Sequence, residues 1–347
     1  MVSTTGHVRA SAGRAAVVAL AAAVSVSACA GQPQQRAASP PRRELPAHPV
    51  TGPSPQIAAP IGILGRFGVA KRQVTFVEPA HTGAAGEDLG RRRLLTQIRY
   101  PLTQGKSGSR PDRSGFPLLL FAPGFMQCGG RYAPLLHAWA SAGYVVAVVN
   151  FPQTDCHAGA RAYEPDLVNQ PADMSYVLSR LLALSAQPHD PFSGLLNGHE
   201  IAAAGQSDGG DTVAALAANA CCSDRRLKAA AVLSGAEWPP MPGRYFAHGA
   251  PPMLLVQGTA DTINPPWTSL QLYRQDPGRR KFYLDLFGAN HLIPYFGMNP
   301  VERLVARVTL AFFDRYVLGQ ARALTAMTHY GDVSGAATLV RGSQLPP

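Results

Sequence analysis

Ser207 lies in the segment Gly205-Gln206-Ser207-Asp208-Gly209, which has the Gly-x-Ser-x-Gly spacing. A short apolar run precedes this segment and a run of small residues with helical spacing follows it. A strand, a sharp turn and a helix in that order would present the serine hydroxyl at the end of a sheet, where it can act as a nucleophile. The alternative is a surface loop that happens to carry two glycines.

A serine hydroxyl becomes a good nucleophile only when a base takes its proton and an acid orients that base. Asp261 follows the apolar run at 253–257, and His291 follows the next apolar run at 281–287. Nucleophile, acid and base therefore come after successive predicted strands, in the chain order that a strand–turn–helix serine site requires. We therefore expect Ser207, Asp261 and His291 to form a catalytic triad.

Both partners have alternatives in the chain. Asp261 could cap the helix expected to begin near residue 265, and His291 could be an ordinary loop histidine. Glu237 is the reserve acid because it follows the preceding predicted strand, and His329 is the reserve base.

A tetrahedral intermediate also needs two backbone N–H donors for its oxyanion. The residue after the nucleophile, Asp208, should supply one donor. The loop after the apolar run at 117–122 should supply the other, with Phe125 as the first choice and Met126 as the second. The side chain of Asp208 is expected to form local hydrogen bonds without taking part in catalysis.

These residues must be positioned by strands that alternate with helices. The pattern predicts strands at 74–77, 94–100, 117–122, 144–150, 201–204, 228–233, 253–257 and 281–287, and helices at 131–142, 173–184, 211–220, 268–275 and 301–317. The first two strands should form a hairpin. Continuous apolar strands separated by amphipathic helices predict a mostly parallel sheet covered by helices on both faces.

The N-terminal region has the composition of an export signal. Arg9 and Arg14 precede an uncharged run at 15–28, which is too short for a comfortable membrane span. The run ends at Val26-Ser27-Ala28-Cys29, which resembles a bacterial lipobox and implies a lipid anchor on Cys29. An ordinary secretory signal cut after Ala28 or Ala30 is the alternative.

Four regions are expected along the chain of 347 residues: a signal peptide at 1–28, a Pro- and Ala-rich disordered tether at 29–66, a catalytic domain at 67–320 and a polar tail at 321–347. Loss of the signal removes two arginines and no acid, so the net charge falls from +10 to +8. No cluster of cations interleaved with aromatic residues suggests nucleic-acid binding.

Four cysteines remain after residue 29, and four cysteines allow three pairings. Cys128 and Cys156 each follow the end of a predicted strand, so that pair is favoured over any pairing of Cys221, including a strained bridge to Cys222. No spacing of cysteine and histidine suggests zinc, and no metal is expected.

The motifs around residues 123–125, 205–210, 258–261 and 288–291 together resemble the α/β-hydrolase superfamily over residues 70–318. Within it, they are similar to the branch that holds dienelactone hydrolases, cutinase-like polyester hydrolases, chlorophyllases and platelet-activating-factor acetylhydrolases. This resemblance implies hydrolysis of carboxylic esters without a cofactor. A serine nucleophile differs from the cysteine of dienelactone hydrolases and from the aspartate of haloalkane dehalogenases.

The short segment at 234–252 leaves no room for a large lid. Trp238 is therefore expected to line an open cleft, as a tryptophan does in polyester hydrolases, or else to pack at its rim. Phe125, Met126 and Ile263 are the other expected substrate contacts. The leading expectation is an exported esterase for short to medium acyl esters. The alternatives are an acyltransferase or peptidase on the same scaffold and a non-catalytic envelope binding protein, and a monomer is the default state.

Overall fold

The computed structural model describes Gly65, residues 67–102 and residues 115–347. The expected signal peptide, Cys29 and all of the expected tether except Gly65 lie outside these residues. Within the described ranges, no helix is long and apolar enough to cross a bilayer.

Nine strands form one sheet in the order β1-β2-β4-β3-β5-β6-β7-β8-β9. Strands β3 (Phe116–Ala122), β4 (Val145–Asn150), β5 (Leu196–Gln206), β6 (Ala229–Leu233), β7 (Met253–Gly258) and β8 (Lys281–Leu286) run parallel. At one edge, β1 (Gly68–Glu78) and β2 (Arg92–Leu102) pair antiparallel, and β2 joins β4 in the same sense. The expected hairpin and the mostly parallel sheet are therefore confirmed.

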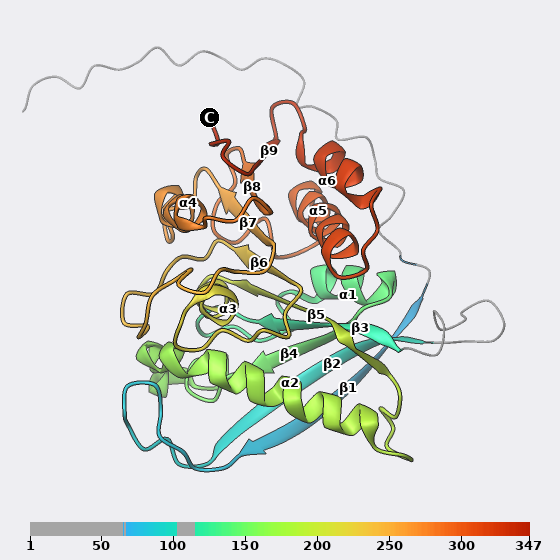
Figure 1. Ribbon diagram of the computed structural model, residues 1–347, viewed down its shortest axis with the longest axis vertical. Coiled ribbons are helices and arrows are strands. Elements are labelled where there is room, and N and C mark those ends of the chain that lie inside the picture. The colour runs from blue at the N-terminus through green and yellow to red at the C-terminus, as the bar shows by residue number, and fades with distance from the viewer. Residues whose placement is uncertain (1–64, 66, 103–114) are drawn as a thin grey trace, which may run out of the picture. The chain divides into compact units, whose positions relative to one another are not determined.

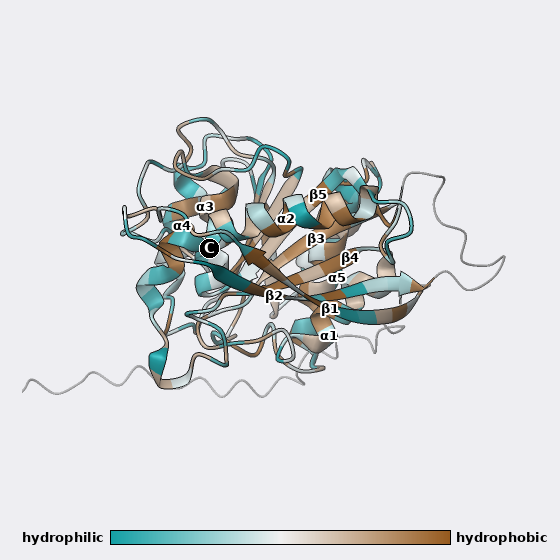
Figure 2. Cartoon of the chain, turned by 90° about the horizontal axis from the view of Figure 1, so that it is seen from below, coloured by the Kyte–Doolittle hydropathy of each residue, from teal (hydrophilic) through white to brown (hydrophobic). Residues whose placement is uncertain are grey.

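The central strands are apolar because helices cover both of their faces. Every residue of β3, β4, β6, β7 and β8 is buried. One face packs against α1 (Ala133–Ala142) and α5 (Pro300–Tyr316), and the other packs against α2 (Gln170–Ala186), α3 (Asp208–Ala218) and α4 (Pro266–Gln275) (Figure 1). Figure 2 shows the hydrophobic strands enclosed between α2 above and α1 below.

Helix boundaries follow local signals. Helix α1 ends at Gly143, whose φ of 116° suits a residue without a side chain. The side chain of Asn299 accepts a hydrogen bond from the Glu302 N–H at 2.9 Å, and this cap begins α5.

The C-terminal region differs from the expected polar tail. Residues 323–341 contain the helix α6 (Ala323–Gly331) and the strand β9 (Ala337–Arg341), which pairs antiparallel with β8. Ala337 and Leu339 of β9 are buried against the α5 side of the core. Strand β9 was not predictable from the sequence, because its five residues are too few to show a clear period and its neighbours are glycine-bearing and polar.

An ion-pair cluster ties the edge of the sheet to the helices. Arg92 at the start of β2 contacts Asp166 at 2.8 Å and Asp173 at 2.6 Å, and all three side chains are buried. Asp166 belongs to the 3₁₀ helix η4 (Glu164–Asn169) and Asp173 to the first turn of α2. Burial opposes the charge on Arg92, but its hydrogen bonds to Asp173 and Asp166 raise its pKa above the ordinary value.

Candidate active site

The turn between β5 and α3 holds Ser207 in a strained conformation. Its φ of 57° and ψ of −128° are rare for a residue with a side chain. A side chain at Gly205 would collide with the Gly209 carbonyl, and one at Gly209 would collide with the Ala122 carbonyl. The two glycines therefore let β5, α3 and β3 approach closely enough to form the tight turn that a nucleophile elbow requires.

His291 lies within hydrogen-bond reach of both Ser207 and Asp261. The Ser207 Oγ is 2.9 Å from the His291 Nε2, and the His291 Nδ1 is 2.8 Å from the Asp261 Oδ2. Ser207 follows β5, Asp261 follows β7 and His291 follows β8. All three therefore lie where the parallel strands have their carboxyl ends. This is the geometry of a nucleophile, a base and an orienting acid.

Asp261 is buried and held as a carboxylate. Its Oδ1 accepts hydrogen bonds from the backbone N–H groups of Ile263 and Asn264, and its Oδ2 also accepts one from the Gln257 side chain. Burial alone would raise the pKa of Asp261, but the hydrogen bonds and the nearby His291 lower it below the ordinary value. The residue is therefore ionised at neutral pH and can fix the imidazole.

The reserve residues lie elsewhere in the structure. Glu237 lines a cavity beside Trp238, and burial raises its pKa. His329 lies on α6, where its ring packs against Tyr330. The Ser207 hydroxyl is hydrogen-bonded to His291, and the carboxylate that bonds the His291 ring is that of Asp261.

The backbone N–H groups of the loop after β3 differ in whether they are already hydrogen-bonded. The Met126 N–H is already bonded to the Thr154 carbonyl at 2.7 Å, and the Gly124 N–H donates to the Tyr132 hydroxyl at 2.9 Å. Among the described residues, no acceptor engages the N–H of Phe125, whereas the N–H of Asp208 donates to the carboxylate of its own residue. These are the two donors expected for an oxyanion, while the second choice, Met126, has its N–H engaged.

The carboxylate of Asp208 accepts a local hydrogen bond from its own backbone N–H. Its Oδ2 is buried and has no hydrogen-bond partner among the described residues. Burial, with a smaller contribution from Glu164, raises the pKa of Asp208 to about 7.

Gln206 was not identified from the sequence. It occupies the position just before the serine in the Gly-x-Ser-x-Gly segment. Its Oε1 accepts a hydrogen bond from the Tyr132 hydroxyl at 2.8 Å, and its Nε2 donates to the His291 carbonyl at 3.2 Å. Tyr132 in turn receives the Gly124 N–H, so Gln206 connects the loop after β3 to the histidine loop. The only sequence signal was a polar residue at the end of an apolar strand.

The expected substrate contacts surround this edge of the sheet. Trp238 is half-buried and lines a cavity of about 550 Å³ together with Asn264 and Trp267. Ile263, next to Asn264, is 62% exposed, and Met126 is 43% exposed. Trp267 was not identified from the sequence, although its side chain is 65% exposed at the start of α4.

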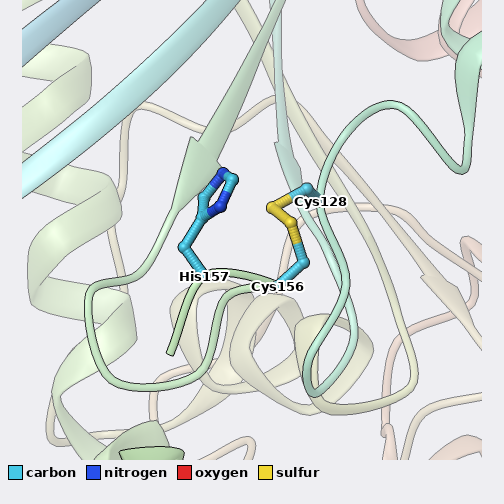
Figure 3. A group of neighbouring side chains, drawn as sticks. All are labelled: Cys128, Cys156 and His157. Atoms are coloured by element: carbon cyan, nitrogen blue, oxygen red, sulfur yellow. A yellow bond between two sulfur atoms is a disulfide. The ribbon is translucent and has the colours of Figure 1, made fainter. Parts of the chain in front are cut away.

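Two disulfides join the four cysteines, Cys128 to Cys156 and Cys221 to Cys222. The favoured first pair is therefore present, and the vicinal pair is present as well. Figure 3 shows His157 beside the Cys128–Cys156 bridge, with one ring nitrogen within 4.8 Å of both sulfurs. Because both sulfurs are bonded to each other, they offer no thiolate to a metal.

A mostly parallel sheet with a serine elbow, and with an acid and a histidine after the following strands, defines an α/β-hydrolase with serine-hydrolase geometry. The chain belongs to the PET hydrolase-like family, whose sequence model matches residues 98–332. It is accordingly a carboxylic ester hydrolase of the serine type, acting on small-molecule or polyester esters. No curated protein matches the chain.

Proposed function

We propose that the chain is an exported serine esterase that hydrolyses short to medium acyl esters through an acyl-enzyme on Ser207. The observation that carries this proposal is the pair of hydrogen bonds of 2.9 and 2.8 Å that links Ser207, His291 and Asp261. Membership in the PET hydrolase-like family supports the reaction class.

In the first half of the reaction, the Ser207 Oγ attacks the ester carbonyl while the His291 Nε2 takes the hydroxyl proton. Asp261 accepts the Nδ1–H hydrogen bond and stabilises the imidazolium that forms. The negative carbonyl oxygen is held by the backbone N–H groups of Phe125 and Asp208. Collapse of the intermediate breaks the ester C–O bond, and the alcohol leaves with the proton from Nε2.

In the second half, a water molecule replaces the alcohol. The His291 Nε2 takes a proton from the water as its oxygen attacks the acyl carbon, and the same oxyanion donors act again. Collapse of this second intermediate returns the proton to the Ser207 Oγ and releases the carboxylic acid. No cofactor or metal enters these steps.

The substrate is proposed to lie against Phe125, Met126, Trp238 and Ile263. Of these, Trp238 lines the cavity of about 550 Å³, which has room for part of an acyl or aromatic group. A polyester chain is a second candidate substrate, because the family is named for hydrolysis of such a polymer.

Substitution of the nucleophile tests the proposal. Ser207→Ala should lower kcat on p-nitrophenyl butyrate by at least about 10³-fold and abolish labelling by a fluorophosphonate probe. Ser179→Ala serves as the matched control, because its exposed hydroxyl lies on α2 and donates to the Ser175 carbonyl. Unchanged turnover in Ser207→Ala would exclude the esterase mechanism. Labelling of wild type without turnover of any ester would favour the acyltransferase, which transfers the acyl group to added alcohols faster than to water.

Export and anchoring form a separate part of the proposal. The signal at 1–28 and the lipobox-like sequence before Cys29 support attachment of the mature protein to the cell envelope by a lipid on Cys29. Mass spectrometry of the native N-terminus should find a diacylglycerol-modified Cys29. An unmodified N-terminus at residue 29 or 31 would indicate a secreted protein instead.

A further inference from the structure

A cationic cavity of about 260 Å³ lies on the β1–β2 pair. The register places Lys71 opposite Arg99 and Gln73 opposite Gln97, so these four side chains share one face of the two strands. Like charges directly opposite each other destabilise a strand pair. None of the described residues that line the cavity is acidic.

Arg99 is the unusual member of this set. The residue is only 5% exposed, yet its Nε and Nη1 atoms have no hydrogen-bond partner among the described residues. Burial lowers the pKa of its guanidinium, and no described carboxylate offsets that effect. A buried cation without a partner is costly, because the charge has lost its water and gained nothing in return.

Arg92 shows how the same strand treats a buried arginine that has a structural role. It is 3% exposed, and two aspartates accept hydrogen bonds from its guanidinium. Arg99 lies seven residues further along β2 and has no such acceptor among the residues that the structure describes. Its guanidinium therefore has donors to offer to an added anion.

We propose that the cavity lined by Lys71, Gln73, Gln97 and Arg99 binds a phosphoryl oxyanion. A guanidinium and an ammonium group supply two positive charges, and two glutamine amides supply neutral donors, which suits a group of several oxygens and up to two negative charges. The volume of about 260 Å³ accommodates a phosphate and a few attached atoms. Lys71 is exposed on the edge strand, so the anion has a route of entry.

The cavity is separate from the triad, which lies at the carboxyl ends of the parallel strands. Leu95 pairs with Asn150 at the carboxyl end of β4, which is the end where the triad lies, whereas Arg99 pairs with Val146 toward the other end. Binding here is therefore independent of the ester chemistry at Ser207. The phosphoryl group can belong to free phosphate or to a lipid headgroup at the membrane surface.

Thermal unfolding in inorganic phosphate tests the site, with chloride keeping the ionic strength constant. Wild type should show a saturable rise in Tm, because a ligand that binds only the folded state stabilises it. Lys71→Gln should raise the apparent Kd at least tenfold. Arg93→Gln is the matched control, because it removes the same charge from an exposed position of β2 that does not line this cavity. Acetate should give no comparable shift.

Arg99→Met adds a second test, because it should raise Tm, whereas most substitutions of buried residues lower it. Removal of the unpaired cation should raise Tm in buffer without phosphate and abolish the phosphate response. If this variant does not fold, the comparison of the phosphate response of Lys71→Gln with that of Arg93→Gln still tests the proposal. The proposal is overturned if wild type shows no saturable shift, if Arg93→Gln weakens the response as much as Lys71→Gln, or if acetate acts as strongly as phosphate.

Binding to lipid vesicles distinguishes a phosphoryl group of a lipid headgroup from free phosphate. If the ligand is a headgroup, cosedimentation with phosphatidylglycerol vesicles should fall more in Lys71→Gln than in Arg93→Gln, with little binding to phosphatidylcholine. A phosphate-dependent Tm shift with equal vesicle binding by the two variants assigns the site to free phosphate. Hydrolysis of p-nitrophenyl butyrate should be unchanged in both variants, so failure of this proposal is distinguishable from failure of the esterase proposal.

Discussion

At the scale of single residues, Gln206 connects Tyr132 to the loop that carries His291. Its side chain bonds the Tyr132 hydroxyl on one side and the His291 carbonyl on the other. It therefore holds the histidine loop against the loop that carries Phe125. We regard Gln206 as a positioning residue that acts through its neighbours.

Gln206→Leu should lower kcat about 10- to 100-fold with little change in KM, because the alignment of base and oxyanion donors matters most in the transition state. Tyr132→Phe should cause a similar loss, since it removes the same hydroxyl link. The measurement is steady-state kinetics on the two single variants and the double variant. Additive losses in the double variant would contradict a shared network.

Asp208 should make stability depend on pH. Its pKa is near 3.9 in the unfolded chain and about 7 in the folded chain, where burial raises it. Between these values the folded state binds more protons, so the free energy of unfolding falls as the pH rises toward 7. Asp208→Asn should therefore be more stable than wild type at pH 8, by about 1–4 kcal/mol.

Urea unfolding of the two proteins at pH 5 and pH 8 checks this prediction. The gain in stability of Asp208→Asn should be smaller at pH 5 than at pH 8, because the free energy of unfolding of wild type keeps falling until the pH reaches about 7. A difference that is the same at both pH values would exclude the raised pKa as the cause.

At the scale of secondary-structure elements, the Arg92 cluster fixes the edge of the sheet to η4 and α2. This cluster could not be predicted from the sequence, because Arg92 lies 74 and 81 residues from its partners and a charged pair leaves no local pattern. The triad residues were easier to place, because each follows the end of an apolar strand that can be recognised locally.

Arg92→Met should lower the free energy of unfolding by about 3–5 kcal/mol, because Asp166 and Asp173 would remain buried without a cation. Arg226→Met is the control, since its ion pair with Asp224 is partly exposed and should cost no more than about 1 kcal/mol. Denaturant unfolding measures both changes. Equal losses would show that burial does not govern the strength of the Arg92 cluster.

At the scale of the whole molecule, β9 extends the sheet beyond β8 and belongs to the fold. Edge pairing of this kind was not predictable from the sequence, because it depends on the unpaired backbone of β8 more than on the side chains of β9. The parallel centre was predictable, since strands that are buried on both faces are apolar throughout.

A chain that ends at Gly335 should be less stable by at least about 2 kcal/mol, because it loses the buried Ala337 and Leu339 and leaves the edge of β8 unpaired. A chain that ends at Gly342 keeps β9 and should match wild type. Tm and light scattering on the two truncations provide the comparison. If both unfold at the same temperature, β9 does not contribute to the stability of the domain.

The order of the strands along the chain also determines when reactivity can first arise. Ser207 and His291 are separated by 84 residues, and they meet only after β7 and β8 have joined the sheet. Such distant pairings form slowly, and a chain synthesised from its N-terminus completes the elbow long before its base exists. A nascent or half-folded chain should therefore be inert toward esters, so the appearance of turnover during refolding would time the docking of the last parallel strands.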